Sequence, residues 1–138
     1  MTLTWLGRAA LYVAFLATLG GITCLMRGNI GEIEAVPGGT DLARQLLAEC
    51  SAVATAFGHA PSAAFATRTE TAVTTHGSRL TSSMYRDLSS GKAVEADQII
   101  GDLIERAQQV HVAIPLLATA LAHLKVYQTR LSATSSDK

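Results

Sequence analysis

Apolar residues recur at helical spacing along most of the chain. The clearest case is Glu95 to Val110, where polar and apolar positions separate onto opposite sides at roughly 100° per residue. Its apolar side holds Ala96, Ile99, Ile100, Leu103, Ile104, Ala107 and Val110. The same spacing predicts helices over residues 40–57, 62–75 and 115–131, with a helical turn from Ile30 to Ala35. No stretch shows the alternation typical of a strand. The sequence therefore predicts an all-α fold, a bundle of five or six helices.

The segment from residue 9 to residue 26 contains 18 consecutive uncharged residues. That length just reaches what a membrane span requires, and a position near the N-terminus also suits a signal segment. Its threonines and paired glycines lower its hydrophobicity. We therefore predict a buried helix surrounded by other helices, and a single-pass membrane protein is the alternative.

Helix-capping residues organise the stretch from Thr81 to Asp97. Ser82 is placed to cap a short helix, on which Ser83 and Asp87 share a face because they lie four residues apart. Gly91 suits the positive φ that ends many helices. Thr40 is expected to cap the second helix in the same way as Ser82.

Glu95 is predicted in the first turn of the next helix, at the border of its apolar stripe. One interpretation is an ordinary first-turn acid, favoured there by the helix dipole. The other is a carboxylate whose ionisation responds to a bound ligand, because apolar neighbours disfavour its charge. The spacing alone leaves both interpretations open.

Composition fits one globular domain. The chain has 138 residues, 49% of them hydrophobic, which is enough for a core. We expect a single helical domain over residues 1–131 and a disordered polar tail over 132–138. Eleven basic and eleven acidic side chains give no net charge, so a nucleic-acid partner is not expected.

Cysteine and histidine usage indicates neither a disulfide framework nor a metal site. Cys24 and Cys50 lie in apolar helical runs and are expected to be buried thiols in a reducing cytoplasm. The four histidines lack ligand spacing. We therefore predict a cytoplasmic protein with no metal.

One constellation resembles a known family. Its residues are Ser82, Ser83, Met84, Asp87, Gly91, Lys92, Glu95, Asp97 and Gly101. In this order and spacing they resemble the C-terminal domain of ketopantoate reductase (2-dehydropantoate 2-reductase). Residues 16–33 are similar to that domain's first long helix and the Gly-Glu turn after it, and the likeness runs from roughly Phe15 to Tyr127.

The resemblance implies a helical domain of the 6-phosphogluconate dehydrogenase C-terminal-like type, packed beside a nucleotide-binding domain. In the complete enzyme the two domains close over NADPH and reduce 2-dehydropantoate to pantoate, a step of pantothenate biosynthesis. The implied substrate-binding residues are Ser83, Asp87 and Asn29, and Glu95 serves the cofactor end. A homo-oligomer is expected.

Two departures from the family pattern stand out. Tyr12 occupies the position of the family's general-acid lysine, with Arg8 as the alternative, and Leu16 and Gly20 occupy asparagine positions. In addition, no strand followed by Gly-x-Gly-x-x-Gly and a helix occurs, so we expect this sequence to lack the family's N-terminal Rossmann domain. The chain alone is not expected to bind NADPH.

Two functions of different classes follow. The first is the substrate-side domain of a ketopantoate-reductase-like oxidoreductase, inactive alone, with a separate nucleotide-binding domain and a small 2-keto acid as partners. The second is a non-catalytic helical module for dimerisation or binding that has kept the fold and lost the chemistry.

Overall fold

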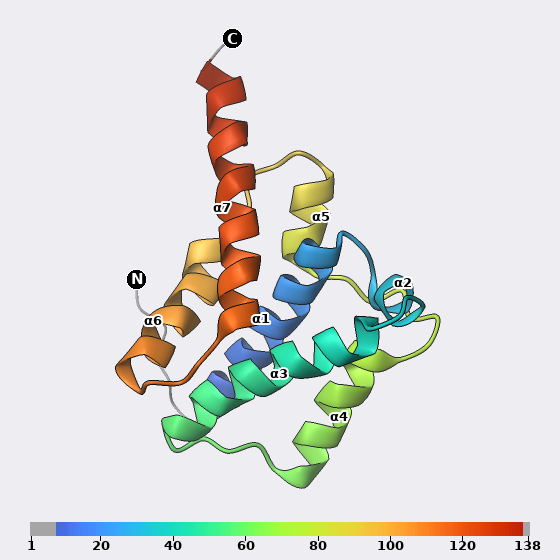
Figure 1. Cartoon of the computed structure of the whole chain (residues 1–138), viewed down its shortest axis with the longest axis vertical. Helices are drawn as coiled ribbons and strands as arrows, with labels where there is room; N and C mark the ends of the chain where they lie inside the picture. The colour runs from blue at the N-terminus through green and yellow to red at the C-terminus, as the bar shows by residue number, and fades with distance from the viewer. Residues whose placement is uncertain (1–7, 137–138) are drawn as a thin grey trace.

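A computed structural model describes the backbone of residues 8–136 and the side chains of residues 9–134. Within this part of the chain the elements are all helical (Figure 1). They are α1 (Arg8–Met26), α2 (Ile30–Glu34), α3 (Gly39–Ala56), α4 (Ala63–Thr74), α5 (Ser83–Ser89), the π-helical turn η1 (Asp97–Gly101), α6 (Asp102–Gln109) and α7 (Pro115–Ser136). The all-α prediction is confirmed. The helices outnumber the five or six expected because α2 is a separate helix and the predicted helix from Glu95 is divided.

Helix α1 is the hub of the bundle. It packs against α3, α7, α5 and η1, and Figure 1 shows it enclosed between them. Ala17, Ile22 and Cys24 are fully buried. By length and composition Ala9–Met26 could cross a membrane, yet 56% of that window is buried inside the structure. The first helix is therefore a core helix, as predicted.

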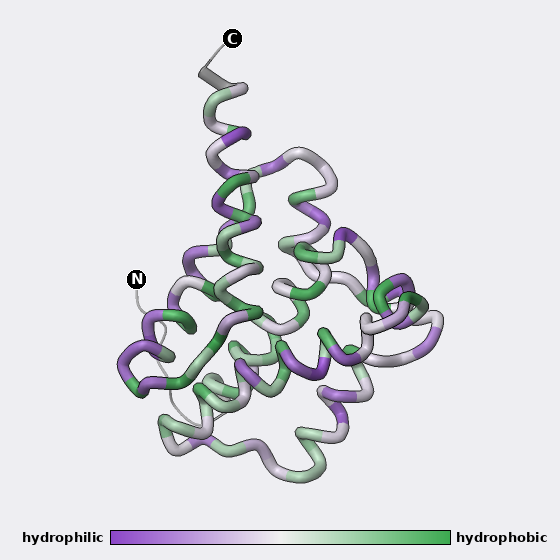
Figure 2. The backbone as a smooth tube through the Cα atoms, in the orientation of Figure 1, coloured by the Kyte–Doolittle hydropathy of each residue, from purple (hydrophilic) through white to green (hydrophobic). Residues whose placement is uncertain are grey.

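Two buried threonines of α1 have hydroxyl groups that are hydrogen-bonded. Thr18 Oγ1 donates to the carbonyl of Ala14 at 2.8 Å, and Thr23 Oγ1 donates to that of Leu19 at 2.6 Å. Such bonds to the preceding turn satisfy a hydroxyl that burial would otherwise leave unpaired. In Figure 2 the tube is mostly white to green along α1, whereas along α6 it mixes hydrophilic and hydrophobic positions.

Helix α3 begins differently from the prediction. Its N-cap is Gly38, with a φ of 82°, so Thr40 lies inside the helix and does not cap it. Further along α3, the buried Glu49 reaches α7: its two carboxylate oxygens accept the N–H groups of Leu116 and Leu117 at 3.1 and 2.9 Å. These N–H groups lie in the first turn of α7, where they have no partner within the helix. Glu49 therefore joins the start of α7 to α3.

The predicted helix from Glu95 to Val110 needs two corrections. Helical structure starts after Glu95, which is exposed in a segment without regular secondary structure and not in a first helical turn. Asp102, expected on the polar side, is buried at 8% exposure and pairs with Arg106 at 2.9 Å. The π-helical turn shifts the residues after it around the helix relative to a continuous α-helix, so an unbroken 100° repeat misplaces them.

The last helix extends further than expected. Helix α7 starts at Pro115, as predicted, and buries Leu117, Ala120 and Leu124. Its backbone stays helical to Ser136, where a disordered tail was expected from Ser132. Residues 137 and 138 of that expected tail lie outside the described part. In Figure 1 the C-terminal part of α7 projects beyond the other helices.

Candidate functional site

A pocket of about 240 Å³ lies where α1, α5 and η1 meet. Its polar residues come from the start of α5 and the residues before it, and its apolar residues come from all three elements. The lining residues are Leu16, Leu19, Thr81, Ser82, Ser83, Met84, Arg86 and Ile99. We call it the Ser83 pocket. It places hydroxyl groups and a guanidinium beside an apolar wall.

Ser82 and Ser83 have different roles at this pocket. Ser82 is buried and caps α5, because its Oγ accepts the N–H of Tyr85 at 3.0 Å. The same Oγ lies 2.8 Å from Thr23 Oγ1. Since Thr23 donates its own proton to Leu19, Ser82 is the donor between the two hydroxyls. Ser82 thus ties α5 to α1, whereas Ser83 is exposed on the pocket side.

Burial determines the protonation state of the Cys24 thiol, which lies next to Thr23 in α1. Desolvation raises the pKa of Cys24 to about 12, against the smaller lowering effects of Arg27 and of a hydrogen bond with Ser82. Cys24 is therefore a neutral thiol at ordinary pH. A neutral, buried thiol is a poor nucleophile.

The end of α5 follows the sequence prediction. Gly91 has a φ of 72°, and the N–H groups of Gly91 and Lys92 bond back to the carbonyls of Leu88 and Asp87 at 3.2 and 2.9 Å. This is the Schellman arrangement that terminates many helices. Asp87 is half-buried and is not among the residues that line the Ser83 pocket.

The segment carrying Glu95 is held by α7. Tyr127 Oη donates to the carbonyl of Lys92 at 2.6 Å, and the amide of Gln128 donates to the carbonyl of Val94. Val94 itself is buried. Glu95 is exposed and does not line the Ser83 pocket, to which η1 contributes Ile99.

Tyr12 lies at a different pocket. Its side chain is 61% exposed and lines a space of about 690 Å³ formed by the first turns of α1 and by the region around the start of α4. Its other lining residues are Leu11, Ala60, Ser62, Phe65 and Arg68. Leu16, one turn further along α1, lines the Ser83 pocket. Arg8 begins α1, and its side chain lies outside the described part of the chain.

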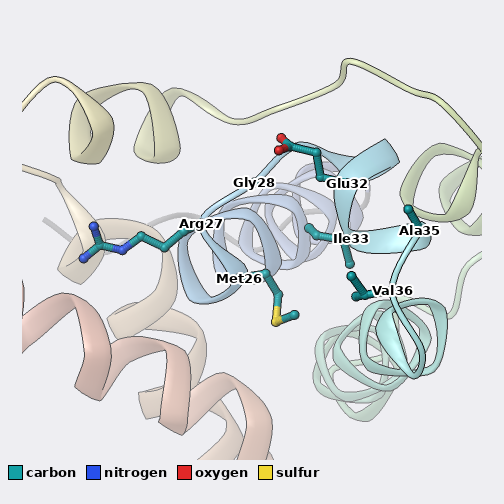
Figure 3. Close-up of a pocket in the computed structure, with 7 residues that line it drawn as sticks. All are labelled: Met26, Arg27, Gly28, Glu32, Ile33, Ala35 and Val36. Carbon is teal, nitrogen blue, oxygen red and sulfur yellow. The ribbon is translucent and has the colours of Figure 1, made fainter.

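Asn29 is occupied in capping α2. Its Oδ1 accepts the N–H of Glu32 at 2.8 Å, and Glu32 Oε1 accepts the N–H of Asn29 at 2.9 Å, which makes a capping box. A third pocket of about 440 Å³ opens beside it, lined by Met26, Arg27, Gly28, Glu32, Ile33, Ala35 and Val36. Figure 3 shows Arg27 extending away from the other six residues.

Close backbone packing fixes the approach to α5. The N–H groups of Ile30 and Gly31 donate to the carbonyls of Leu80 and Ser78 at 3.0 and 2.8 Å. A Cβ on Gly31 would lie 2.7 Å from Ser78 O, so only glycine permits this contact. Helix α2 thus positions the residues that lead to Ser82.

The structure brings only part of the predicted site together. Ser83 lies in the pocket between α1, α5 and η1, whereas Tyr12 lines another, and Asp87, Asn29 and Glu95 line none of the three pockets described here. Sequence reasoning missed Thr81, Arg86 and Ile99, whose only signal was their nearness to Ser83 and Glu95 in the chain. In the described part of the chain, no cluster of three or more His, Cys, Asp or Glu could hold a metal ion.

Comparison with known proteins identifies relatives over most of the chain. A family profile described as ketopantoate reductase PanE/ApbA C terminal matches residues 10–128. The oxidoreductase YkpB of Bacillus subtilis strain 168, described as uncharacterized, is 32% identical over 114 residues, which are 83% of this chain and 38% of YkpB.

Solved structures of the same family have a similar fold. A dimeric ketopantoate reductase from Staphylococcus aureus is 25% identical, with a TM-score of 0.77 over 90% of this chain and 43% of that one. A PanE/ApbA family ketopantoate reductase from Ralstonia eutropha JMP134 is 21% identical, with a TM-score of 0.79 over 91% of this chain and 42% of that one. The chain thus spans about two fifths of the length of these relatives.

Proposed function

This chain belongs to the family of ketopantoate reductase C-terminal domains, and from that premise we propose that it forms the substrate side of an NADPH-dependent reductase. The substrate would be a small 2-keto acid, with 2-dehydropantoate as the first candidate. The observation that carries the proposal is the position of Ser83. The serine of the family pattern lies at a pocket that combines hydroxyl groups with an apolar wall.

The chain's own residues would bind and orient the substrate. Ser83 would hydrogen-bond a substrate oxygen, and Leu16, Leu19 and Ile99 would receive its branched carbon chain. NADPH, when bound by a nucleotide-binding domain, supplies the hydride. Glu95 is our candidate for the cofactor end, and it follows directly on the segment that Tyr127 and Gln128 hold against α7.

Tyr12, the candidate proton donor, does not line the Ser83 pocket. Tyr12 carries a hydroxyl at the family's lysine position, yet it lines a different pocket from Ser83. A general acid must come within hydrogen-bond reach of the atom that it protonates. We therefore propose substrate binding, and not proton transfer, as the contribution of the described residues.

Binding of 2-dehydropantoate to the purified chain tests this function. We expect backbone amide NMR shifts confined to Leu16, residues 81–86 and Ile99, and weaker binding by Ser83→Ala. No reductase activity is expected from the chain alone. Shifts that avoid the Ser83 pocket would contradict the proposal, as would NADPH oxidation by the chain alone at the rate of a complete enzyme.

A second proposed function is a helical dimerisation or binding module. Gly20, at a family asparagine position, leaves room for Met84, whose Cε lies 2.6 Å from the place that a Cβ would take. The side chain of Met84 thus fills the space beside Gly20, where the resemblance implies a polar asparagine side chain. This function predicts a dimer in sedimentation experiments together with no binding of 2-dehydropantoate.

Free thiols support a cytoplasmic location, which we also propose. Cys24 and Cys50 are both buried and unbridged. Structural cysteines of secreted domains are commonly paired in disulfides. Fractionation of cells expressing the protein would test the location.

A further inference from the structure

We propose that Arg86, together with Thr81 and Ser83, forms the carboxylate-binding end of the Ser83 pocket and makes it selective for small monocarboxylic acids. This inference rests on the proposed function, because it assigns the anionic group of the ligand to named residues of the same pocket. It adds a specificity residue that the family pattern of serines, aspartate and glutamate did not indicate.

The arrangement of Arg86 suits this role. Ser83 and Arg86 lie three residues apart on α5 and therefore share a face. Arg86 Nη1 donates to Thr81 Oγ1 at 3.2 Å, and both residues line the pocket together with Ser83. A guanidinium carries five N–H donors in a planar fork, so donors remain for two parallel bonds to a carboxylate.

The charge of Arg86 is not neutralised by a neighbouring acid. Arg44 and Arg106 pair with Glu70 and Asp102, but Arg86 forms no ion pair among the described residues. The other residues that line the pocket are uncharged. A bound carboxylate would therefore meet one positive charge and no competing negative one.

The size and polarity of the pocket define the ligand. One guanidinium with neutral hydroxyls matches the single charge of a monocarboxylate better than the two charges of a phosphate. Beyond the hydroxyls the wall consists of Leu16, Leu19, Met84 and Ile99, within about 240 Å³. A short branched acid would direct its carboxylate to Arg86 and its carbon chain to these residues.

The test compares Arg86→Gln with the matched control Arg130→Gln, which changes an exposed arginine of α7. Both proteins are titrated with 3-methyl-2-oxobutanoate, with 3-methylbutanoate and with the methyl ester of the first, followed by amide NMR shifts. Inorganic phosphate is titrated as a competing anion. Arg86→Lys keeps the charge and loses the planar fork.

We expect Arg86→Gln to weaken binding of 3-methyl-2-oxobutanoate at least about tenfold, since hydrogen bonds between charged groups are among the strongest in proteins. Arg86→Lys should lie between that variant and the wild type, and Arg130→Gln should match the wild type. The ester should bind weakly to all four proteins. Arg86 is exposed, so its replacement by glutamine should leave α5 folded.

Several outcomes would overturn the inference. They are equal affinity of the wild type and Arg86→Gln for the acid, tighter binding of phosphate than of the acids, or no binding of either acid to the wild type. Failure of the proposed function would give a different result. If 3-methyl-2-oxobutanoate and 3-methylbutanoate bind equally well, and Arg86→Gln weakens the binding of both, the carboxylate site is supported but a preference for 2-keto acids is refuted.

Discussion

The hydroxyl of Ser82 connects two helices through one oxygen atom. It accepts the N–H of Tyr85 at the start of α5 and bonds Thr23 of α1, where both side chains are buried. We predict that Ser82→Ala lowers the free energy of unfolding by about 1–3 kcal/mol, because a helix cap is lost and a buried hydrogen bond is broken. Urea unfolding measures the change.

Ser83→Ala is the matched control for that prediction, because Ser83 is exposed and one residue away. Its effect on stability should stay within about 0.5 kcal/mol. Equal losses from the two substitutions would show that the bond between Thr23 and Ser82 contributes nothing.

The two thiols should be unreactive in the folded protein. Burial is the largest cause that raises the pKa of both Cys24 and Cys50, from 9.0 to about 12. We predict negligible labelling by a disulfide reagent at pH 8 and reaction of both thiols after unfolding in guanidinium. Rapid labelling of either thiol in the native protein would contradict the burial described here.

The same pKa changes determine a pH dependence of stability. Unfolded thiols lose their protons near pH 9.0, whereas the buried ones keep theirs to about pH 12. The unfolded state therefore binds fewer protons in this interval, and the free energy of unfolding should fall as pH rises from 9 to 12. Below pH 9 this contribution should be constant.

Sequence reasoning at the residue scale found local partners and missed distant ones. The cap at Ser82 and the positive φ at Gly91 follow from a few adjacent residues, and both are confirmed. The partner of Ser82 is 59 residues away, and the backbone partners of Glu49 are 67 and 68 residues away. No local pattern encodes such pairs, because they depend on how the helices pack.

Among the elements, η1 and the segment before it depend on α7. Lys125 pairs with Asp97 at 2.6 Å, but both side chains are at least half exposed, and such ion pairs contribute about 0–1 kcal/mol. The bonds from Tyr127 and Gln128 to backbone carbonyls are therefore the main restraint. They hold the segment from Lys92 to Val94 against α7.

We predict that Tyr127→Phe speeds amide hydrogen exchange over residues 92–96 and lowers the free energy of unfolding by about 0.5–1.5 kcal/mol. Exchange within α3 should change only as much as global stability does. If residues 92–96 exchange no faster relative to α3, Tyr127 does not hold this segment.

Two helical glycines should respond to alanine in opposite directions. A Cβ on Gly39 would lie 1.7 Å from the carbonyl oxygen of Ile33, so the backbone must move. We predict a loss of at least about 2 kcal/mol for Gly39→Ala.

Gly101 provides the contrast. It has a φ of −61°, and its nearest neighbour to a new Cβ is Asp97 Oδ1 at 3.4 Å. We predict that Gly101→Ala gains about 0.5–1 kcal/mol, because alanine restricts the unfolded chain. Thermal unfolding of the two variants decides both signs, and destabilisation of both would refute the contrast.

Sequence reasoning at the element scale identified helices better than their ends. Periodicity located α3, α4 and α7. It did not predict that α3 is capped by Gly38, or that the helical structure expected from Glu95 begins only after that residue. A π-helical turn has no simple residue code, and a glycine can cap a helix without a side chain. Both depend on the neighbouring helices.

Across the whole molecule, α1 determines stability because it contacts most of the bundle. Ile22 is fully buried in this helix. We predict that Ile22→Ala lowers the free energy of unfolding by about 2–5 kcal/mol. Val126→Ala, at a side chain that is 54% exposed on α7, should change it by less than about 0.5 kcal/mol.

Guanidinium unfolding followed by circular dichroism measures both variants of this pair. A small effect of Ile22→Ala would mean that the bundle does not depend on α1. A large effect of Val126→Ala would instead indicate that α7 buries this side chain against another molecule.

The fold as a whole could be predicted from the sequence, and the candidate site only in part. The fold rests on a repeated pattern that many residues share. The site depends on where single side chains point, which is why Tyr12 and Ser83, both placed by the same resemblance, line separate pockets. Arg86 could be identified as a lining residue of the Ser83 pocket only from the packing of α5 against α1, which the sequence does not show.

The position of α1 as the hub has a consequence for synthesis on the ribosome. This helix is translated before every helix that covers it, and α7 begins only at Pro115. At about 5–20 residues per second, the 88 residues between the two helices take roughly 4–18 s. Throughout that interval the most apolar of the described helices lacks its final covering, so we expect it to be a segment that chaperones bind in the nascent protein.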